Sequence, residues 1–233
     1  MNLKSILSYS FQSFYLAGSF LLLFIFLPTF YNLSIGIPLS VIGLVILTSR
    51  LFDVISDFLI GYLSEKRIIS GRSKKNQILL GIIVFIFSLF GLYVIQSDNI
   101  YSFIFFYNLA LVSYSIAIIP YDSIVVDQKK ILKKRFRLAT IKEIFAILGV
   151  LSALIIPTVI SKLQGVDLLN PNVIKISGLI FIILAITGGL IFYLFYDDEL
   201  NYKSNEISWV QLLSLIHISE PTRQEAISYA VFC

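Results

Sequence analysis

The sequence predicts an all-α, polytopic membrane protein with six transmembrane helices. Apolar residues make up 58% of the 233 residues and charged residues only 14%, with a mean hydropathy of +0.89. A soluble domain has roughly 45–50% apolar and about 25% charged residues. The apolar residues form six runs of about 20 residues, the length that crosses the hydrocarbon core. Each run must be helical, because a lipid-exposed backbone finds no water to bond its amides.

The six runs follow one another with short spacers, which leave no room for a soluble domain between them. The first run is too long for a signal-peptide core, and residues 1–5 contain no small-residue cleavage motif, so we expect a retained membrane helix. In chain order the predicted spans are 8–31, 38–63, 77–95, 101–126, 138–160 and 174–196.

Positive charges predict how these spans are oriented. The connections between spans two and three and between spans four and five are basic, whereas the opposite side has only Lys162 and Lys175. Because cytoplasmic loops are enriched in Lys and Arg, we expect a cytoplasmic N-terminus in the inner or plasma membrane of the cell. The net charge of +4 then reflects topology, so membrane lipid is an expected partner and nucleic acid is not. The basic residues are Lys66, Arg67, Arg72, Lys74 and Lys75, then Lys129, Lys130, Lys133, Lys134, Arg135 and Arg137.

The second span contains three charged residues, Arg50, Asp53 and Asp57. Each costs about 2.5–3.5 kcal/mol near the bilayer centre on insertion scales, so they need an interior or aqueous environment. At about 3.6 residues per turn they share one face, with the carboxylates roughly 6 Å apart along the axis and the hydroxyl of Ser56 close by. Such hard oxygen ligands suit sodium or a proton, so we predict a coupling-ion site. Alternatively, Arg50 and Asp53 only neutralise each other, which leaves Asp57 unexplained.

Charged residues in the fourth and fifth spans have two interpretations each. Asp122 follows Pro120 and Tyr121 and either contacts substrate or reaches the basic loop from the helix end. Lys142 precedes Glu143, so a local pair, or a side chain that extends to the membrane surface, competes with substrate contact. Asp122 and Lys142 are therefore candidate substrate-binding residues.

The second span and the loop after it resemble a motif of the glycoside–pentoside–hexuronide:cation symporters, the melibiose-permease-like family of the major facilitator superfamily. The family pattern is R-x-x-D-x-x-x-D-P-x-x-G, an acidic-basic turn and G-R-R/K. This chain reads Arg50-Leu-Phe-Asp53-Val-Ile-Ser-Asp57-Phe-Leu-Ile-Gly61-Tyr-Leu-Ser-Glu65-Lys-Arg67, then Gly71-Arg72. Weaker agreement extends the resemblance over residues 6 to about 200. It implies the N-terminal six-helix bundle of a major-facilitator fold, built of two inverted three-helix repeats.

The resemblance implies Na⁺- or H⁺-coupled symport of a small solute such as a sugar or glycoside. Asp53 and Asp57 would hold the cation, with Ser56 where the family often has Asn and Ser115 as a hydroxyl from the fourth helix. Arg50 would tune that site.

The resemblance also concerns substrate binding and conformational change. Lys142 stands where a fifth-helix Arg contacts sugar, whereas the family's sugar-binding acids fall on Ala17 and Ile118, and Phe58 replaces the proline. The loop between helices two and three would take part in conformational change through Gly61, Glu65, Arg67, Gly71 and Arg72.

The predicted organisation is a six-helix bundle at 1–200, the start of a central cytoplasmic loop at 201–212, and a non-biological tail at 213–233. Residues 213–223 resemble a translated transposase sequencing adapter and 227–233 a translated flow-cell adapter, so His217 and Cys233 are excluded from fold reasoning. Because family members have twelve helices, we expect the C-terminal six-helix half as a missing partner, and no transport by this chain alone.

Two other function classes fit parts of the sequence. D-x-x-x-D also occurs in intramembrane prenyl and phosphatidyl transferases, where carboxylates hold magnesium diphosphate. Those sites need further acidic residues nearby, and this helix continues into Gly61 and basic residues, so we expect no enzyme. A non-transporting sensor or scaffold of the same fold is the other alternative. With one His and one Cys, neither a metal cluster nor a cofactor is predicted beyond the coupling ion.

Overall fold

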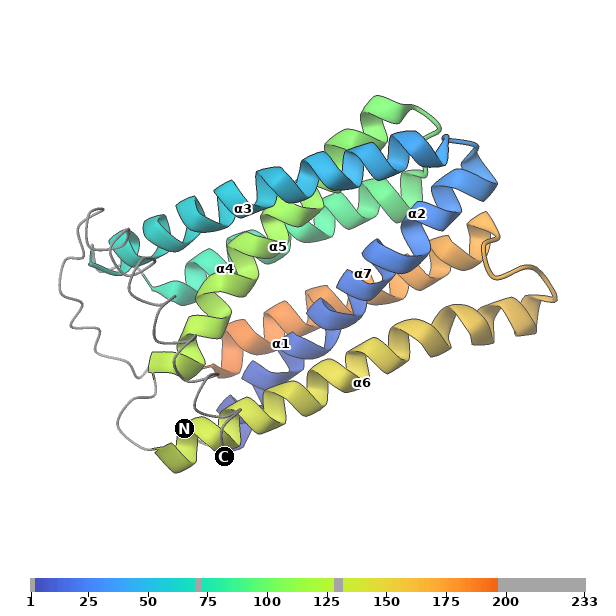
Figure 1. Cartoon of the computed structure of the whole chain (residues 1–233). Coiled ribbons are helices and arrows are strands. Elements are labelled where there is room, and N and C mark those ends of the chain that lie inside the picture. Colours follow the sequence, from blue (N-terminus) through green and yellow to red (C-terminus); the bar gives the residue numbers. More distant parts are fainter. Residues whose placement is uncertain (1–2, 70–72, 128–131, 197–233) are drawn as a thin grey trace, which may run out of the picture.

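The computed structural model describes residues 3–69, 73–127 and 132–196, which form a bundle of long helices with no strand among them (Figure 1). In this part of the chain six helical stretches are long and apolar enough to cross a membrane. They are Lys4–Ile35, Leu39–Ser64, Lys74–Ile95, Ile100–Val125, Phe136–Gln164 and Pro171–Phe195. The predicted all-α fold and its six spans are confirmed. The first and fifth spans are longer than predicted, because helix continues past the apolar run into polar residues such as Lys4 and Lys162.

The first span changes helical form along its length. It is a π-helix up to Phe26, two residues before Pro28, whose ring nitrogen has no hydrogen to donate to the preceding turn. Gly36 ends the span with a φ of 92°, a left-handed conformation that glycine adopts without strain. The pieces are α1 (Leu3–Leu21), a π-helical stretch (Leu22–Phe26), α2 (Leu27–Phe30) and a second π-helical stretch (Tyr31–Ile35).

The other five spans are each built on one long α-helix. Two of them begin with a side-chain cap: Ser73 accepts a hydrogen bond from the amide of Lys75, and Asn170 accepts one from the amide of Asn172. The helices are α3 (Leu39–Ile69), α4 (Lys74–Phe90) with a π-helical end (Gly91–Ile95), α5 (Ile100–Asp127), α6 (Leu132–Gln164) and α7 (Pro171–Phe195).

Along the chain the helices divide into two three-helix units, α1, α3 and α4 and then α5, α6 and α7, and the most extensive contacts run between the two units. α1 lies against α6 and α7, α5 lies against α3 and α4, and α4 contacts α7. Exchanging α1 with α5, α3 with α6 and α4 with α7 turns the contacts of α1 into those of α5 and leaves the α4–α7 contact unchanged. Since each unit has three crossings, the two units run in opposite directions through the membrane, in agreement with the predicted inverted repeats.

Glycines allow the central helices to touch. A side-chain carbon added to Gly149 of α6 would fall on the carbonyl oxygen of Phe14 in α1, and one added to Gly18 of α1 would lie 2.8 Å from the carbonyl oxygen of Gly149. In the α4–α5 contact, a carbon added to Gly81 would lie 2.6 Å from the amide nitrogen of Ala117. Small residues of this kind let helix backbones approach closely in a membrane.

The end of the bundle that carries the N-terminus is joined by polar contacts (Figure 1). Tyr9 of α1 donates to the carbonyl of Tyr121 in α5 and Tyr121 donates to the carbonyl of Tyr9, both at 2.8 Å. Lys74 donates to the hydroxyl of Ser123 in α5 at 2.6 Å, and Lys75 donates to a carbonyl just beyond the end of α7 at 3.0 Å. Lys74 and Lys75, which the sequence analysis counted with the basic loop, therefore also link the end of α4 to α5 and to the end of α7.

α3 and α6 lie at the flanks of the bundle. Only 22% and 17% of their most apolar stretches are buried, against 56% for the first span. Their outward side chains are large and apolar, as at Phe52 and Val54 of α3 and at Ile147 and Ile155 of α6. These faces require lipid or another apolar bundle as a neighbour.

Candidate functional site

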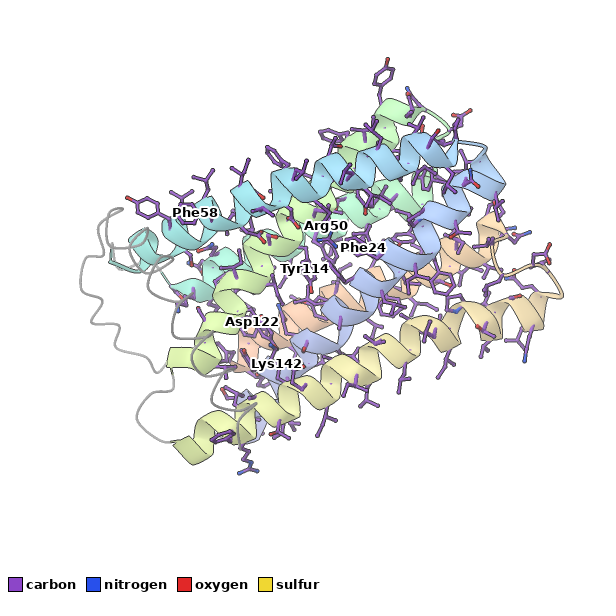
Figure 2. All side chains as sticks on the ribbon, in the orientation of Figure 1. Phe24, Arg50, Phe58, Tyr114, Asp122 and Lys142 are labelled. Atoms are coloured by element: carbon purple, nitrogen blue, oxygen red, sulfur yellow. The ribbon has the colours of Figure 1, made fainter. Side chains whose placement is uncertain are left out.

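Arg50 and Asp53 form an ion pair within α3, on the side of α3 that faces the first span. Nη1 of Arg50 lies 3.1 Å from Oδ2 of Asp53, one turn further along. The guanidinium lies over the ring of Phe24, 4.0 Å from its centroid, and 5.7 Å from the centroid of Phe20. Figure 2 shows Arg50 near Phe24 and Tyr114 in the middle of the bundle. Because aromatic faces attract cations, Arg50 is held by a carboxylate on one side and by the first span on the other.

The second oxygen of Asp53 is bonded from α5. The hydroxyl of Ser115 donates to Oδ1 of Asp53 at 3.3 Å, so residues predicted to act together from helices two and four do meet. Ser56 donates to the backbone carbonyl of Asp53 at 3.0 Å, which engages its proton within α3 and leaves its oxygen able to accept. The side chain of Asp53 is only 13% exposed.

Asp57 lies one turn beyond Asp53, within electrostatic range of it. Its Oδ1 is buried, and no hydrogen-bond partner for this oxygen exists among the residues that the structure describes. A buried acceptor without a partner costs about 1–3 kcal/mol, and more when charged. The Arg50–Asp53 pair of the alternative interpretation thus exists, and Asp57 stands outside it with an oxygen available to a ligand or a proton.

Aromatic residues that the sequence did not single out complete this region. The ring of Tyr114 packs on Phe20 with centroids 4.7 Å apart. The hydroxyl of Tyr107 is buried, lacks a partner within the described ranges, and lies within electrostatic range of Arg50 and Asp53. With 20 Phe and 13 Tyr in the chain, no pattern separates these from aromatics that face lipid. The one available signal was the four-residue spacing of Phe20 and Phe24, which places both rings on the same face of the first helix.

A second polar cluster joins α5 and α6 nearer the N-terminal end (Figure 2). Nζ of Lys142 lies 2.7 Å from Oδ1 of Asp122 and 3.4 Å from Oε1 of Glu143, and 5.6 Å from the ring centroid of Tyr121. The Lys142 side chain is 15% exposed, whereas the two acids are half exposed or more. Both candidate substrate-binding residues therefore meet in one ion pair, and the local pair with Glu143 also forms.

These features place two polar clusters within a helix bundle of the size and pattern expected of a transporter half. The family model described as MFS/sugar transport protein matches residues 8–224, which is most of the chain. The chain belongs to this family.

Membership in the MFS/sugar transport protein family agrees with the resemblance seen in the sequence and makes the chain a multi-pass membrane protein of the major-facilitator type. The search of curated proteins gave no match. The family match passes residue 212 and enters 213–233, which lie outside the described residues. The attribution of that segment to adapter DNA stays a prediction.

Of the residues predicted to belong to the loop after the second span, Gly61, Glu65 and Arg67 instead lie within α3, because the helix continues beyond the apolar run to Ile69. A side-chain carbon added to Gly61 would meet no heavy atom within 4 Å, so open space adjoins this part of α3. Glu65 and Arg67 lie in the last turns of α3, and their side chains are outside the described part of the chain. Gly71 and Arg72 also lie outside the described residues. Their role in conformational change stays a prediction.

Proposed function

We propose that this chain forms part of a cation-coupled symporter, in which Asp53 and Asp57 hold the coupling ion, Na⁺ or H⁺. One observation supports this above the others: Oδ1 of Asp57 is buried and unpartnered in the described structure, beside the Asp53–Ser115 hydrogen bond. A buried carboxylate is stable when it is protonated or bound to a cation. A coupled transporter must exchange these states for an empty one during its cycle.

In this proposal Arg50 keeps the site usable when the ion leaves. Its guanidinium already lies 3.1 Å from Asp53 and is held over Phe24. A fixed positive charge offsets one of the two carboxylates, so that the empty site carries a smaller uncompensated charge in a poorly solvated region. The same charge weakens cation binding, which favours release of the ion. Arg50 thereby tunes affinity.

The proposed solute is small and rich in hydroxyl groups, such as a sugar or glycoside, and it binds between this bundle and a second six-helix half. The cluster of Lys142, Asp122 and Glu143 offers donors and acceptors with a formal charge of one negative unit, which disfavours an anionic solute. Phe20 and Tyr114 supply an apolar surface on which a sugar ring can pack.

Gradient-driven uptake by the complete transporter tests the proposed coupling. Proteoliposomes given an inward Na⁺ or H⁺ gradient should concentrate at least one member of a panel of radiolabelled hexoses, pentoses and their methyl glycosides. Collapse of the effective gradient with an ionophore should return the solute to equilibrium, because accumulation has no other energy source. Equilibration without accumulation under both gradients would contradict coupling, and no uptake of any panel member would contradict the solute class.

We also propose that the N-terminus and both basic loops face the cytoplasm of a cell membrane. In a Cys233→Ser background, Ser97→Cys should react with an impermeant maleimide in intact cells, whereas Ser73→Cys should react only after permeabilisation. The reason is that Ser73 adjoins the lysine-rich start of α4, while Ser97 lies at the other end of that span. The reverse labelling pattern, or equal labelling of both, would show this orientation to be wrong.

A further inference from the structure

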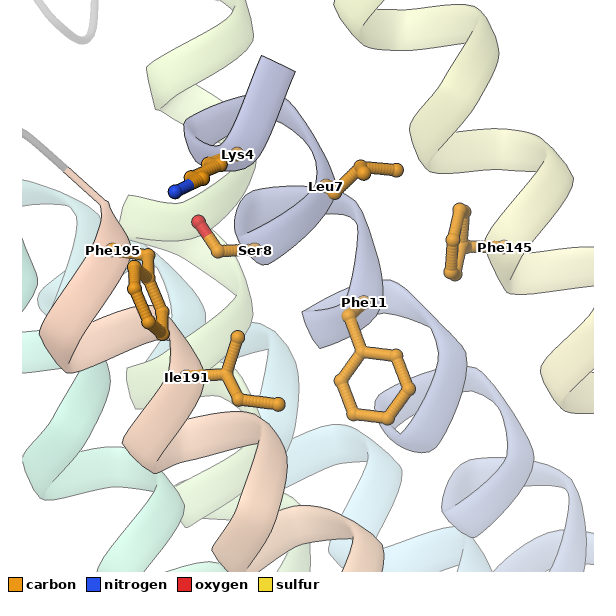
Figure 3. Close-up of a pocket in the computed structure, with 7 residues that line it drawn as sticks. All are labelled: Lys4, Leu7, Ser8, Phe11, Phe145, Ile191 and Phe195. Carbon is orange, nitrogen blue, oxygen red and sulfur yellow. The ribbon is translucent and has the colours of Figure 1, made fainter. Parts of the chain in front are cut away.

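A pocket of about 450 Å³ lies at the end of the bundle that carries the N-terminus, apart from both polar clusters (Figure 3). α1 contributes most of its lining, and α6 and α7 supply the rest. Its volume is in the range of about 300–1,000 Å³ that small-molecule pockets occupy. Apart from Lys4 and Ser8 the lining is apolar: Leu7, Phe11, Phe145, Ile191 and Phe195.

The pocket runs from the membrane boundary into the apolar region. Lys4 is the first residue of the first span and Phe195 is the last residue of the sixth, so both lie at the same boundary. Phe11 follows Lys4 by two helical turns, which is roughly 10 Å along α1. The site therefore has a charged opening at the membrane surface and an apolar interior at the depth of lipid chains.

The charge at the opening has no counter-ion within the described ranges. Lys4 is exposed and has neither a hydrogen bond nor an ion pair there, and no residue that lines the pocket is acidic. Ser8 donates to the carbonyl of Ser5 at 3.0 Å, so its oxygen can still accept. A ligand that combines an apolar chain with a negative group would complement both parts of the site.

We propose that the pocket binds one acyl chain of an anionic phospholipid, with the headgroup phosphate beside Lys4. An acyl chain brings no polar group into the apolar interior, whereas an extended peptide segment would bring backbone amides that need partners. Phospholipid is also the molecule that surrounds this depth of the bundle. In the orientation proposed above, the lipid belongs to the cytoplasmic leaflet, whose anionic lipids attract basic side chains near the surface.

Lipid retention by the purified full chain tests this assignment. Native mass spectrometry would follow phosphatidylglycerol and phosphatidylcholine added to detergent micelles. Lys4→Gln should lower retention of phosphatidylglycerol about fivefold and leave phosphatidylcholine unchanged, since one basic side chain near the surface is lost. Leu7→Trp fills the pocket and should lower retention of both lipids. Lys162→Gln, at the other end of the bundle, is the matched charge control, and Ile183→Trp, exposed on α7, is the matched size control.

A phosphatidylglycerol with a photoreactive acyl chain locates the lipid. Crosslinks should concentrate at Phe11 and Phe145 and should be lost in Leu7→Trp. Unchanged retention and crosslinking in both pocket variants would overturn the assignment, as would crosslinks spread evenly over the bundle surface. Crosslinks from a photoreactive residue placed at Phe11 to residues 197–233, or to a second copy of the chain, would assign the pocket to those occupants instead.

Discussion

Asp53→Asn and Asp57→Asn in the complete transporter are each expected to abolish accumulation of solute driven by a cation gradient. Asparagine keeps the size of the side chain, but it neither takes up a proton at neutral pH nor balances the charge of Na⁺. Removing one partner of a buried ionic interaction costs about 3–5 kcal/mol, so ion affinity should fall on the order of 100-fold or more. Gradient-driven uptake measures this loss, and Asp98→Asn, at an exposed acid outside the site, is the control.

The two variants should differ in stability, which separates a binding role from a purely structural one. Asp53→Asn removes the partner of Arg50 and should lower the melting temperature. Asp57→Asn removes a buried carboxylate oxygen that has no partner in the described structure, so the melting temperature should stay the same or rise. If both variants still concentrate solute against its gradient, the ion site is assigned wrongly. A large loss of stability in Asp57→Asn would instead indicate a structural role.

Gly149→Leu is expected to prevent stable packing of α1 on α6. The first side-chain carbon alone would fall on the carbonyl oxygen of Phe14, and a backbone atom cannot move aside as a flexible side chain can. Overpacking costs about 1–3 kcal/mol in ordinary cores, and the cost against backbone should lie at the upper end or beyond. Thermal unfolding in detergent, read by size-exclusion chromatography, measures the effect.

Gly43→Leu is the matched control for this helix contact. Gly43 is also helical, but a carbon added there would meet no heavy atom within 4 Å, so the variant should unfold at nearly the wild-type temperature. Equal melting temperatures for the two leucine variants would show that α1 and α6 do not touch at Gly149. Gly149→Ala should fall between the wild type and Gly149→Leu, because it adds the clashing carbon and nothing more.

The sequence predicted the features that depend on one helix at a time. Membrane spans follow from run length and composition, and Arg50, Asp53 and Asp57 share a face because helical periodicity fixes it. Features that depend on two helices were not visible unless the family resemblance supplied them, as for Ser115. The spacing of Phe20 and Phe24 places both rings on one helix face, but it could not show that Phe24 covers Arg50, because contacts between helices are set by packing rather than by spacing along the chain.

The second polar cluster also contains one contact that lies within a single helix and was predictable, and one that joins two helices and was not. Lys142 and Glu143 are adjacent, so their pairing could be weighed from the sequence alone. The shorter contact of Lys142 is with Asp122, twenty residues earlier on another helix, and it depends on how α5 and α6 approach each other. Helix ends were also less predictable than helix centres, since polar residues such as Lys4 stay helical beyond the apolar run.

The packing of α1 has a consequence for how the protein is made. The principal neighbours of this helix are α6 and α7, and roughly 110 residues are synthesised between the end of α1 and the start of α6. At about 5–20 residues per second, that interval lasts on the order of 5 to 20 s. During this time a helix with buried polar residues such as Gln12 and Ser19 waits in the bilayer without its partners. Insertion of the protein therefore requires that the polar residues of the first span be kept from lipid by another partner until the fifth and sixth spans have been inserted.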